Sequence, residues 1–229
     1  MQNLLLLHGA LGASDQFIPL QLSLQHTFQV HTLDFIGHGK VPDGNAPFTM
    51  QLFASNVLEY LDHNKLERAN FFGYSMGGYV AMYLAKHHPD RVQKIITLGT
   101  KFRWNQGIAQ QEVKMLDPEQ ILAKVPAFAE ALKQRHKAND WSVVMKKTAT
   151  MLMALGKDNV LKLDHYRSIN TPCLLMLGDR DKMVSLEETV NVYKTLPNAQ
   201  LAILPGTPHV IEKVDYKMLG WFIQRFIQE

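Results

Sequence analysis

The segment Gly73-Tyr74-Ser75-Met76-Gly77-Gly78 constrains the fold of this chain most strongly. The residues before it, 69–72, are apolar and aromatic, which is typical of a buried strand. The residues after it, 79–85, are rich in alanine and carry apolar side chains at helical spacing. A Gly-x-Ser-x-Gly sequence between a strand and a helix predicts a tight turn that holds the serine hydroxyl above the sheet. Ser75 is therefore the candidate nucleophile.

Short apolar runs recur along the chain and predict six strands. Most of these runs are continuous rather than alternating, as in Leu4–Leu7 and Cys173–Leu177. A continuous apolar strand is buried on both faces, so helices must cover both sides of the sheet. The segments between the runs have helical periodicity, and repeated strand–helix units predict a doubly wound α/β fold with a mainly parallel six-stranded sheet. The predicted strands cover about residues 3–7, 28–33, 69–74, 93–98, 172–178 and 200–204.

One connection is too long for an ordinary crossover between strands. Roughly 70 residues separate the fourth predicted strand from the fifth. They contain helix starts at Asp117-Pro118 and Asp140-Trp141 and a helix stop at Gly156. We therefore expect residues 101–165 to form a helical cap inserted above the active edge of the sheet, while residues 1–100 and 166–229 form the core.

The cap region is basic. Residues 101–171 hold 12 Lys and Arg against 7 Asp and Glu, whereas the whole chain has a net charge of +3. A solvated outer face of the cap helices explains this bias, and guidance of an acidic substrate is the alternative. Lys101 and Arg103 directly follow the fourth strand, at the edge where ligands bind in such folds. They are candidate pocket residues, together with Trp104 and Trp141.

Length and composition suit one α/β enzyme domain, with 229 residues of which 46% are hydrophobic and 20% charged. Cys173 is the only cysteine, so no internal disulfide can form, and its apolar neighbours indicate a core residue. The small net charge does not indicate a nucleic-acid partner. No stretch approaches the ~20 apolar residues that span a bilayer, and Leu4–Leu7 is too short for a signal-peptide core. We therefore expect a cytoplasmic protein without membrane contact. No pattern in the sequence indicates how many subunits it forms.

A serine nucleophile requires a base within hydrogen-bond reach and an acid that orients this base. His209 lies on the loop after the last predicted strand and can fold over the sheet edge toward Ser75. The fifth strand ends in Gly178-Asp179-Arg180-Asp181, and strand alternation does not separate Asp179 from Asp181 as the acid. In either case the nucleophile, acid and histidine follow one another along the chain in the order of one known fold.

The other histidines carry no comparable signal. His63, His87, His88 and His136 lie in helical stretches, and we expect them on the protein surface. No pair of histidines has a metal-ligand context such as His-Glu-x-x-His, so we expect no metal ion.

The first predicted strand ends in the glycine-rich turn His8-Gly9-Ala10-Leu11-Gly12. Such a turn lets backbone N–H groups face a pocket, so the N–H groups of Ala10 and Met76 are the candidate donors to an oxyanion. His8 directly precedes the turn, a position that suits a structural hydrogen bond better than a catalytic base.

These segments together resemble the α/β-hydrolase superfamily, in the group of small hydrolases that carry a cap. The resemblance covers the chain except for the cap. It implies that Asp181 is the acid, because the family's acid is typically the aspartate three residues after the strand-end glycine. The family's usual pair of leading strands is missing here, which leaves the six expected strands. The matching segments are Leu6-Leu7-His8-Gly9, residues 34–39, the turn around Ser75, Gly178-x-x-Asp181, and His209 followed by Glu212.

The resemblance implies a serine hydrolase without a cofactor, acting on a small-molecule ester, thioester or similar acyl substrate. Carbon–carbon bond hydrolysis or a lyase reaction uses the same three residues in this family and is the nearest alternative. A small-molecule receptor that retains the three residues is a second alternative. Tyr79 stands where the menaquinone-pathway synthase of this fold places an arginine, which weakens the resemblance to that enzyme.

Overall fold

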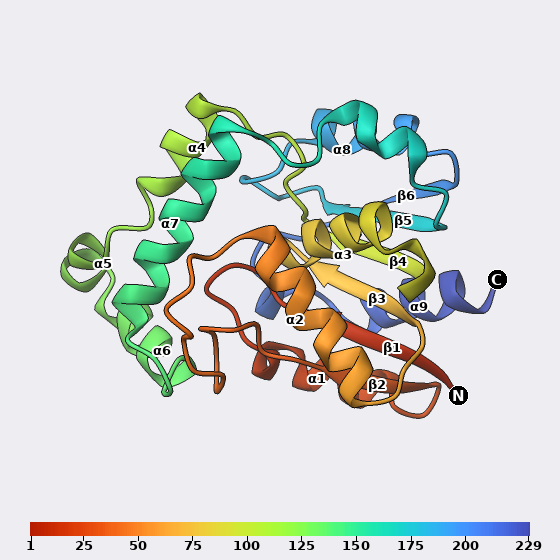
Figure 1. The fold of residues 1–229 in the computed structure, drawn as a ribbon, viewed down its shortest axis with the longest axis horizontal. Helices are drawn as coiled ribbons and strands as arrows, with labels where there is room; N and C mark the ends of the chain where they lie inside the picture. The colour runs from red at the N-terminus through yellow and green to blue at the C-terminus, as the bar shows by residue number, and fades with distance from the viewer.

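The computed structural model describes all 229 residues and contains a single six-stranded sheet (Figure 1). All neighbouring strands are parallel, in the order β2-β1-β3-β4-β5-β6. The predicted doubly wound α/β fold is confirmed, and each strand lies within one residue of its predicted limits. The strands are β1 (Gln2–Leu7), β2 (Phe28–Thr32), β3 (Ala69–Tyr74), β4 (Val92–Leu98), β5 (Cys173–Gly178) and β6 (Ala199–Leu204).

Helices cover both faces of the sheet. Helices α1 (Ile18–Leu24) and α9 (Tyr216–Gln228) pack on one face, and α2 (Met50–His63), α3 (Met76–His87) and α8 (Leu186–Thr195) pack on the other. Alternate residues of β1 enter the two cores: Leu5 and Leu7 join the α2–α3 side, whereas Leu4 and Leu6 join the α1–α9 side. Burying each of these side chains stabilises the fold by roughly 1.5–3 kcal/mol, which explains why the strand sequences are continuously apolar.

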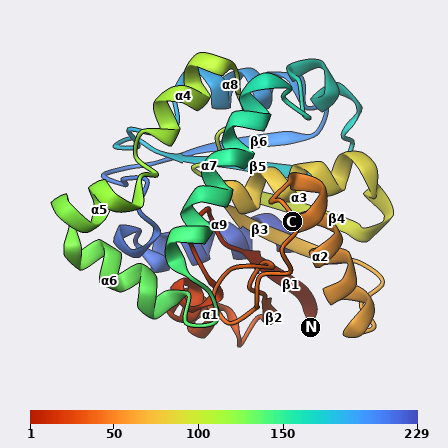
Figure 2. The ribbon, with the colours of Figure 1, turned by 60° about the vertical axis from the view of Figure 1, so that its left-hand side comes forward.

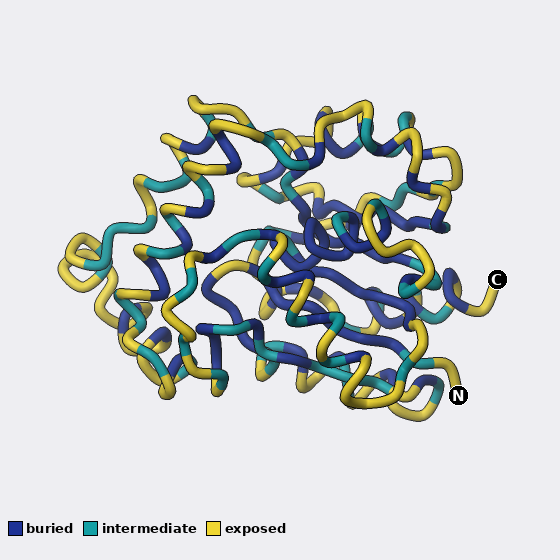
Figure 3. Tube along the Cα trace, in the orientation of Figure 1, coloured by how far each residue is buried: buried dark blue, intermediate teal, exposed yellow.

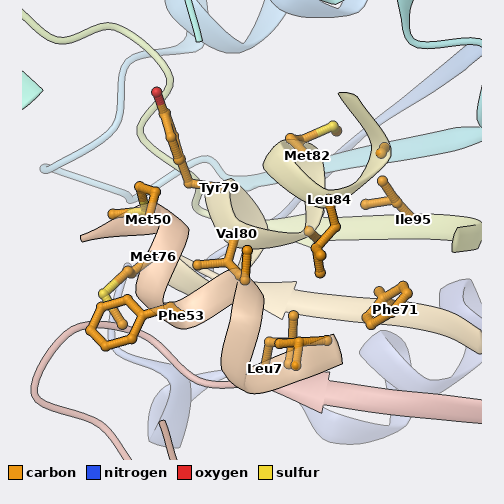
Figure 4. Packing of buried hydrophobic residues seen from close by; sticks show 14 of the residues in the cluster. Leu7, Met50, Phe53, Phe71, Met76, Tyr79, Val80, Met82, Leu84 and Ile95 are labelled. Carbon is orange, nitrogen blue, oxygen red and sulfur yellow. The ribbon is translucent and has the colours of Figure 1, made fainter. Parts of the chain in front are cut away.

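The larger of the two cores lies between α2, α3 and the sheet. Figure 4 shows Phe53 of α2 and Val80 of α3 packed above Leu7 of β1. Met50 and Met76 lie in the same cluster, at the end where the strands finish (Figure 4). The core therefore extends directly to the edge of the sheet at which a site is expected.

Four helices between β4 and β5 form a separate layer beyond the carboxyl ends of the strands (Figures 1 and 2). Side-chain caps fix three of their starts, at Asn105, Asp117 and Asp140. The predicted stop at Gly156 lies one residue before the observed end of the last helix. A Cβ at Gly156 would lie 2.4 Å from Ala109 Cβ. The four helices are α4 (Gln106–Val113), α5 (Pro118–Lys124), α6 (Pro126–Arg135) and α7 (Trp141–Lys157).

Polar contacts hold this cap layer against the core. Lys147 of α7 contacts both carboxylate oxygens of Asp43 at 2.6 Å and donates to the carbonyl of Ala46 at 2.9 Å. Arg135 of α6 contacts Glu212 at 3.0 Å, on the segment that follows His209. The sheet is buried along most of its length, whereas the outer faces of the cap helices are exposed (Figure 3). The cap is thus attached to two separate segments of the core, one around Asp43 and one around Glu212.

Four short 3-10 helices complete the structure: η1 (Ser14–Phe17), η2 (Pro89–Arg91), η3 (Leu163–Ser168) and η4 (Ile211–Lys213). None of the helices is both long and apolar enough to cross a membrane.

Candidate active site

Ser75 lies at the sharp turn between β3 and α3. Its backbone has φ 52° and ψ −117°, a conformation that costs a non-glycine residue about 1–3 kcal/mol. The turn is anchored on both sides, because the Ser75 N–H donates to Leu98 O at 2.9 Å and the Thr100 hydroxyl donates to Ser75 O at 3.0 Å. The surrounding contacts therefore maintain a strained backbone that places the serine at the start of a helix.

The glycines of the turn are required by close approach of the backbone. A Cβ at Gly73 would lie 2.4 Å from Gly78 Cα, and a Cβ at Gly77 would lie 2.1 Å from Leu7 O. Contacts shorter than 3 Å force neighbouring atoms to move, and here the neighbours are backbone. The Gly-x-Ser-x-Gly pattern thus reflects how tightly β3 and α3 meet beside β1.

The structure brings Ser75, His209 and Asp181 together in one hydrogen-bonded series. His209 Nε2 lies 3.3 Å from Ser75 Oγ, and His209 Nδ1 lies 2.7 Å from Asp181 Oδ2. The Asp181 side chain is 1% exposed and that of His209 is 12% exposed. An imidazole held in this way can accept the serine proton at Nε2 while the carboxylate fixes the proton on Nδ1.

The two aspartates after β5 have different partners. Asp181 Oδ1 accepts hydrogen bonds from the N–H groups of Met183 and Val184 at 2.8 and 2.9 Å. Burial favours a higher pKa for Asp181, but its contacts with His209 and with these two N–H groups outweigh burial and lower the pKa below its usual value. Asp179 instead accepts from Thr207 N at 3.2 Å and does not contact the imidazole. Geometry therefore separates two residues that strand alternation could not.

Two glycines allow His209 to approach the strand ends. A Cβ at Gly178 would fall 2.0 Å from Thr207 O, on the loop that carries His209. Gly99 follows β4 with φ +60°, and a Cβ there would lie 3.1 Å from Asp181 Oδ2 and 3.2 Å from His209 Nδ1. The loop after β6 can therefore fold across the carboxyl ends of β5 and β4.

Ala10 and Met76 line the same cavity as Ser75. The hydrogen bonds outside regular helices and strands include none donated by their backbone N–H groups. Leu11, next to Ala10, has φ 56°, so the turn after β1 is also strained. His8 Nε2 accepts from Phe35 N at 3.1 Å and Nδ1 contacts Gly9 O at 2.8 Å, which is the structural role expected for this residue.

His136 is buried, so its expected place on the surface is wrong, although His63, His87 and His88 are exposed. It ends α6 of the cap and reaches into the core, where its Nδ1 accepts from Gly39 N at 3.0 Å and its Nε2 contacts Leu11 O at 3.1 Å. Helical periodicity gave no signal for this residue, because its partners are distant in the sequence.

The cavity beside Ser75 has a volume of about 70 Å³ and lies between the strand ends and the cap. Lys101 and Trp104 line it, as expected, but Arg103 and Trp141 do not. The N–H groups of Phe102 and Arg103 both donate to Glu188, and the Arg103 side chain lies beside Glu187 at 3.8 Å. The residues that line the cavity are Ala10, Met50, Ser75, Met76, Tyr79, Lys101, Trp104, Glu112, Leu152, Leu155, Met183, Val184 and His209.

Trp141 is placed away from the cavity by the length of α7. The cavity is lined by Leu152 and Leu155, which lie toward the other end of that helix. Eleven residues separate Trp141 from Leu152, or roughly 16 Å along a helix. No group of three or more His, Cys, Asp or Glu side chains is arranged to hold a metal ion.

Comparison with known proteins identifies relatives along the whole chain. A family model described as the alpha/beta hydrolase fold matches residues 2–140. RutD of Stutzerimonas stutzeri strain A1501, assigned as a carbamate hydrolase, is 26% identical over 229 residues, which cover 93% of this chain and 86% of that protein.

Two solved structures share the fold over 100% of this chain. A thermophilic esterase from Thermogutta terrifontis has a TM-score of 0.80 at 20% identity, with 90% of its chain covered. The 2-hydroxy-6-oxo-6-phenylhexa-2,4-dienoate hydrolase of Rhodococcus sp. strain RHA1 has a TM-score of 0.79 at 21% identity, with 91% covered. These likenesses concern the fold.

Proposed function

The chain belongs to the alpha/beta hydrolase family, and from this premise we propose that it is a serine hydrolase acting on an ester, thioester or similarly activated acyl group. The observation that carries the proposal is the series from Ser75 Oγ through His209 to Asp181, with contacts of 3.3 and 2.7 Å. Its serine end opens into a cavity that a substrate can enter. The hydrolase relative of 26% identity supports the same class of reaction.

The reaction begins when Ser75 Oγ attacks the carbonyl carbon of the substrate and His209 Nε2 takes the hydroxyl proton. Asp181 stabilises the imidazolium that forms and holds the ring in the tautomer that can accept a proton at Nε2. His209 then protonates the leaving group, and the acyl group remains on Ser75. In the second half of the reaction His209 activates water, which releases the acid and restores the serine.

The developing oxyanion binds to the N–H groups of Ala10 and Met76. Both lie at the cavity, and Met76 begins α3, where the helix dipole adds positive potential. Removing one such donor in other hydrolases costs about 3–4 kcal/mol of transition-state stabilisation. Because both donors are backbone groups, the strained turns around Ser75 and Leu11 position them.

Ser75→Ala tests the proposal. We expect turnover of p-nitrophenyl esters to fall by several orders of magnitude while the fold is retained, because the nucleophile is lost. A fluorophosphonate should label the wild type and Ser55→Ala, an exposed serine on α2, but not Ser75→Ala. Turnover that survives in folded Ser75→Ala would refute the mechanism.

The same assays separate the alternatives. Labelling of Ser75 without turnover of any ester or thioester would indicate a receptor that retains the three residues. Cleavage of a vinylogous 1,5-diketone in the absence of ester turnover would indicate a carbon–carbon bond hydrolase.

A further inference from the structure

Two polar side chains at the cavity have no role in the proposed reaction. Nine of the 13 residues that line the cavity are hydrophobic, and Ser75 and His209 belong to the reaction. The remaining two are Lys101, which follows β4, and Glu112, near the end of α4. They are therefore the only other charged side chains there.

Lys101 and Glu112 form an ion pair in a largely apolar setting. Lys101 Nζ lies 3.3 Å from Glu112 Oε1, and the two side chains are 14% and 13% exposed. Removing two charges from water costs several kcal/mol per ion, and their attraction offsets this cost only when their remaining hydrogen-bonding groups are also satisfied. The stability of the fold is thus a weak explanation for this pair.

The protein leaves much of the pair's hydrogen-bonding capacity unused. A lysine ammonium has three donors, and Lys101 makes one hydrogen bond, to Met183 O, besides its contact with Glu112. A carboxylate offers about four acceptor positions, and the contact with Lys101 is the only polar contact of the Glu112 side chain. At least one N–H and several acceptor positions therefore remain beside the cavity.

We propose that Lys101 and Glu112 form a specificity site for a neutral substrate group that both accepts and donates a hydrogen bond, such as a hydroxyl or a primary amide. The inference rests on the proposed hydrolase function. A hydroxyl oxygen accepts from Lys101 while its hydrogen is donated to Glu112. A carboxylate would be opposed by Glu112 and an ammonium by Lys101, so the pair selects against both charged groups.

The size of the cavity limits the part of the substrate that reaches the pair. The cavity volume is about 70 Å³, and a water molecule needs roughly 10–15 Å³ on that measure. The cavity therefore accommodates roughly five to seven atoms of water size. This corresponds to a short chain that ends in the polar group.

The ion pair between Lys101 and Glu112 also bears on whether the positive charge of the cap attracts an anionic substrate. From the sequence, guidance of an anionic substrate by Lys101 and Arg103 was the alternative to a solvated surface. Glu112 balances the charge of Lys101 inside the cavity, and Arg103 lies outside it with a side chain that is 52% exposed. The local charge at the cavity thus favours a neutral polar group over an anion.

Matched pairs of esters test the proposal. Methyl 4-hydroxybutanoate is compared with methyl pentanoate, and 3-hydroxypropyl acetate with butyl acetate, so that a hydroxyl replaces a methyl group on either side of the ester. Acid release is followed in a pH-stat, and reactions without enzyme correct for spontaneous lactonisation. We expect kcat/KM to be at least about tenfold higher for the hydroxyl member of one pair, as for hydrogen bonds to charged groups.

The variants Lys101→Met and Glu112→Gln should each reduce this preference by about tenfold. Arg103→Met and Glu187→Gln make the same changes in the pair outside the cavity and should leave the preference unaltered. If a single variant unfolds, Lys101→Met/Glu112→Leu removes both charges together and avoids an unpaired buried ion.

The outcomes distinguish this inference from the proposed function. Ester turnover with equal kcat/KM within both pairs, or a preference that the variants leave unchanged, would overturn the specificity site while the hydrolase proposal stands. A higher kcat/KM for monomethyl succinate that Lys101→Met abolishes would assign the site to anions instead. Absence of Ser75-dependent turnover with every ester would overturn both.

Discussion

Replacing Asp181 by asparagine tests the proposed mechanism most directly. Asp181 Oδ1 accepts two backbone N–H groups, from Met183 and Val184, whereas Oδ2 faces His209 Nδ1. In Asp181→Asn, the amide oxygen must occupy the first position, because the two N–H groups there can bond only to an acceptor. The amide NH₂ then points at His209 Nδ1. The imidazole must respond by carrying its proton on Nε2, where it can no longer accept the proton of Ser75.

The expected loss follows from this change of tautomer. The same substitution in another triad lowers kcat by about 10⁴ with the geometry intact. The hydrogen bond between His209 and Asp181 is short, at 2.7 Å, and Asp181 is 1% exposed, so water cannot replace the carboxylate. We therefore expect kcat to fall by about 10³ to 10⁴, or about 4–5.5 kcal/mol in the activation free energy.

Asp179→Asn is the matched control. Asp179 Oδ1 accepts from Thr207 N at 3.2 Å, and an asparagine oxygen can keep this hydrogen bond; its other contact is with the exposed Arg180 Nε at 3.9 Å. We expect less than about a tenfold loss, as for one hydrogen bond of ordinary strength. The assay is steady-state hydrolysis of a p-nitrophenyl ester at pH 7 to 8, with thermal unfolding to verify the fold. Equal losses for the two variants, or a larger loss for Asp179→Asn, would refute the assignment of Asp181 as the acid.

Two further predictions concern stability. Gly77→Ala should lower the free energy of unfolding by at least about 3 kcal/mol, because its Cβ would lie 2.1 Å from a backbone oxygen of β1; thermal unfolding measures this, and Gly107→Ala, with 3.5 Å to its nearest neighbour, should change little. Burial lowers the pKa values of His8, His38 and His136, that of His8 from 6.5 to about 4. The unfolded chain therefore binds more protons between pH 6.5 and 4, and the free energy of unfolding should fall as the pH drops through this window, by about 3 kcal/mol from His8 alone. Urea denaturation that shows constant stability from pH 7 to pH 4 would contradict this account.

Local sequence patterns were sufficient to predict the sheet. The central strands are mostly runs of buried residues whose neighbours in the sequence alternate between the two cores, as Leu4 and Leu5 of β1 do, whereas the edge strands β2 and β6 are only partly buried. The turn at Ser75 was equally readable, because the requirement for Gly73 and Gly77 arises from atoms that adjoin the same turn or the adjacent strand. Such patterns can be recognised in a single sequence because the interactions that cause them are local or repeat with a simple period along the chain.

The sequence also placed Ser75, Asp181 and His209 at the ends of three strands, but their contact depends on the sheet. The parallel direction of the strands brings the loops after β3, β5 and β6 to one edge, and the order β3-β4-β5-β6 sets them close together along it. The choice between Asp179 and Asp181 required an observed direction for each carboxylate, which strand alternation does not supply for residues two apart.

The contacts of the residues between β4 and β5 depend on the tertiary structure alone. His136 reads as a surface residue of a helix, yet it is buried against Leu11 and Gly39, which are about 100 residues or more away in the sequence. The sequence shows Lys101 as an unpaired positive charge, whereas in the fold Glu112 lies beside it. Contacts with α8 direct Arg103 away from the cavity. The sequence by itself determined the sheet, the turn at Ser75 and the positions of the proposed acid and base along the chain. The direction of each cap side chain depends on partners brought together by packing, so only the tertiary structure could decide the lining of the cavity.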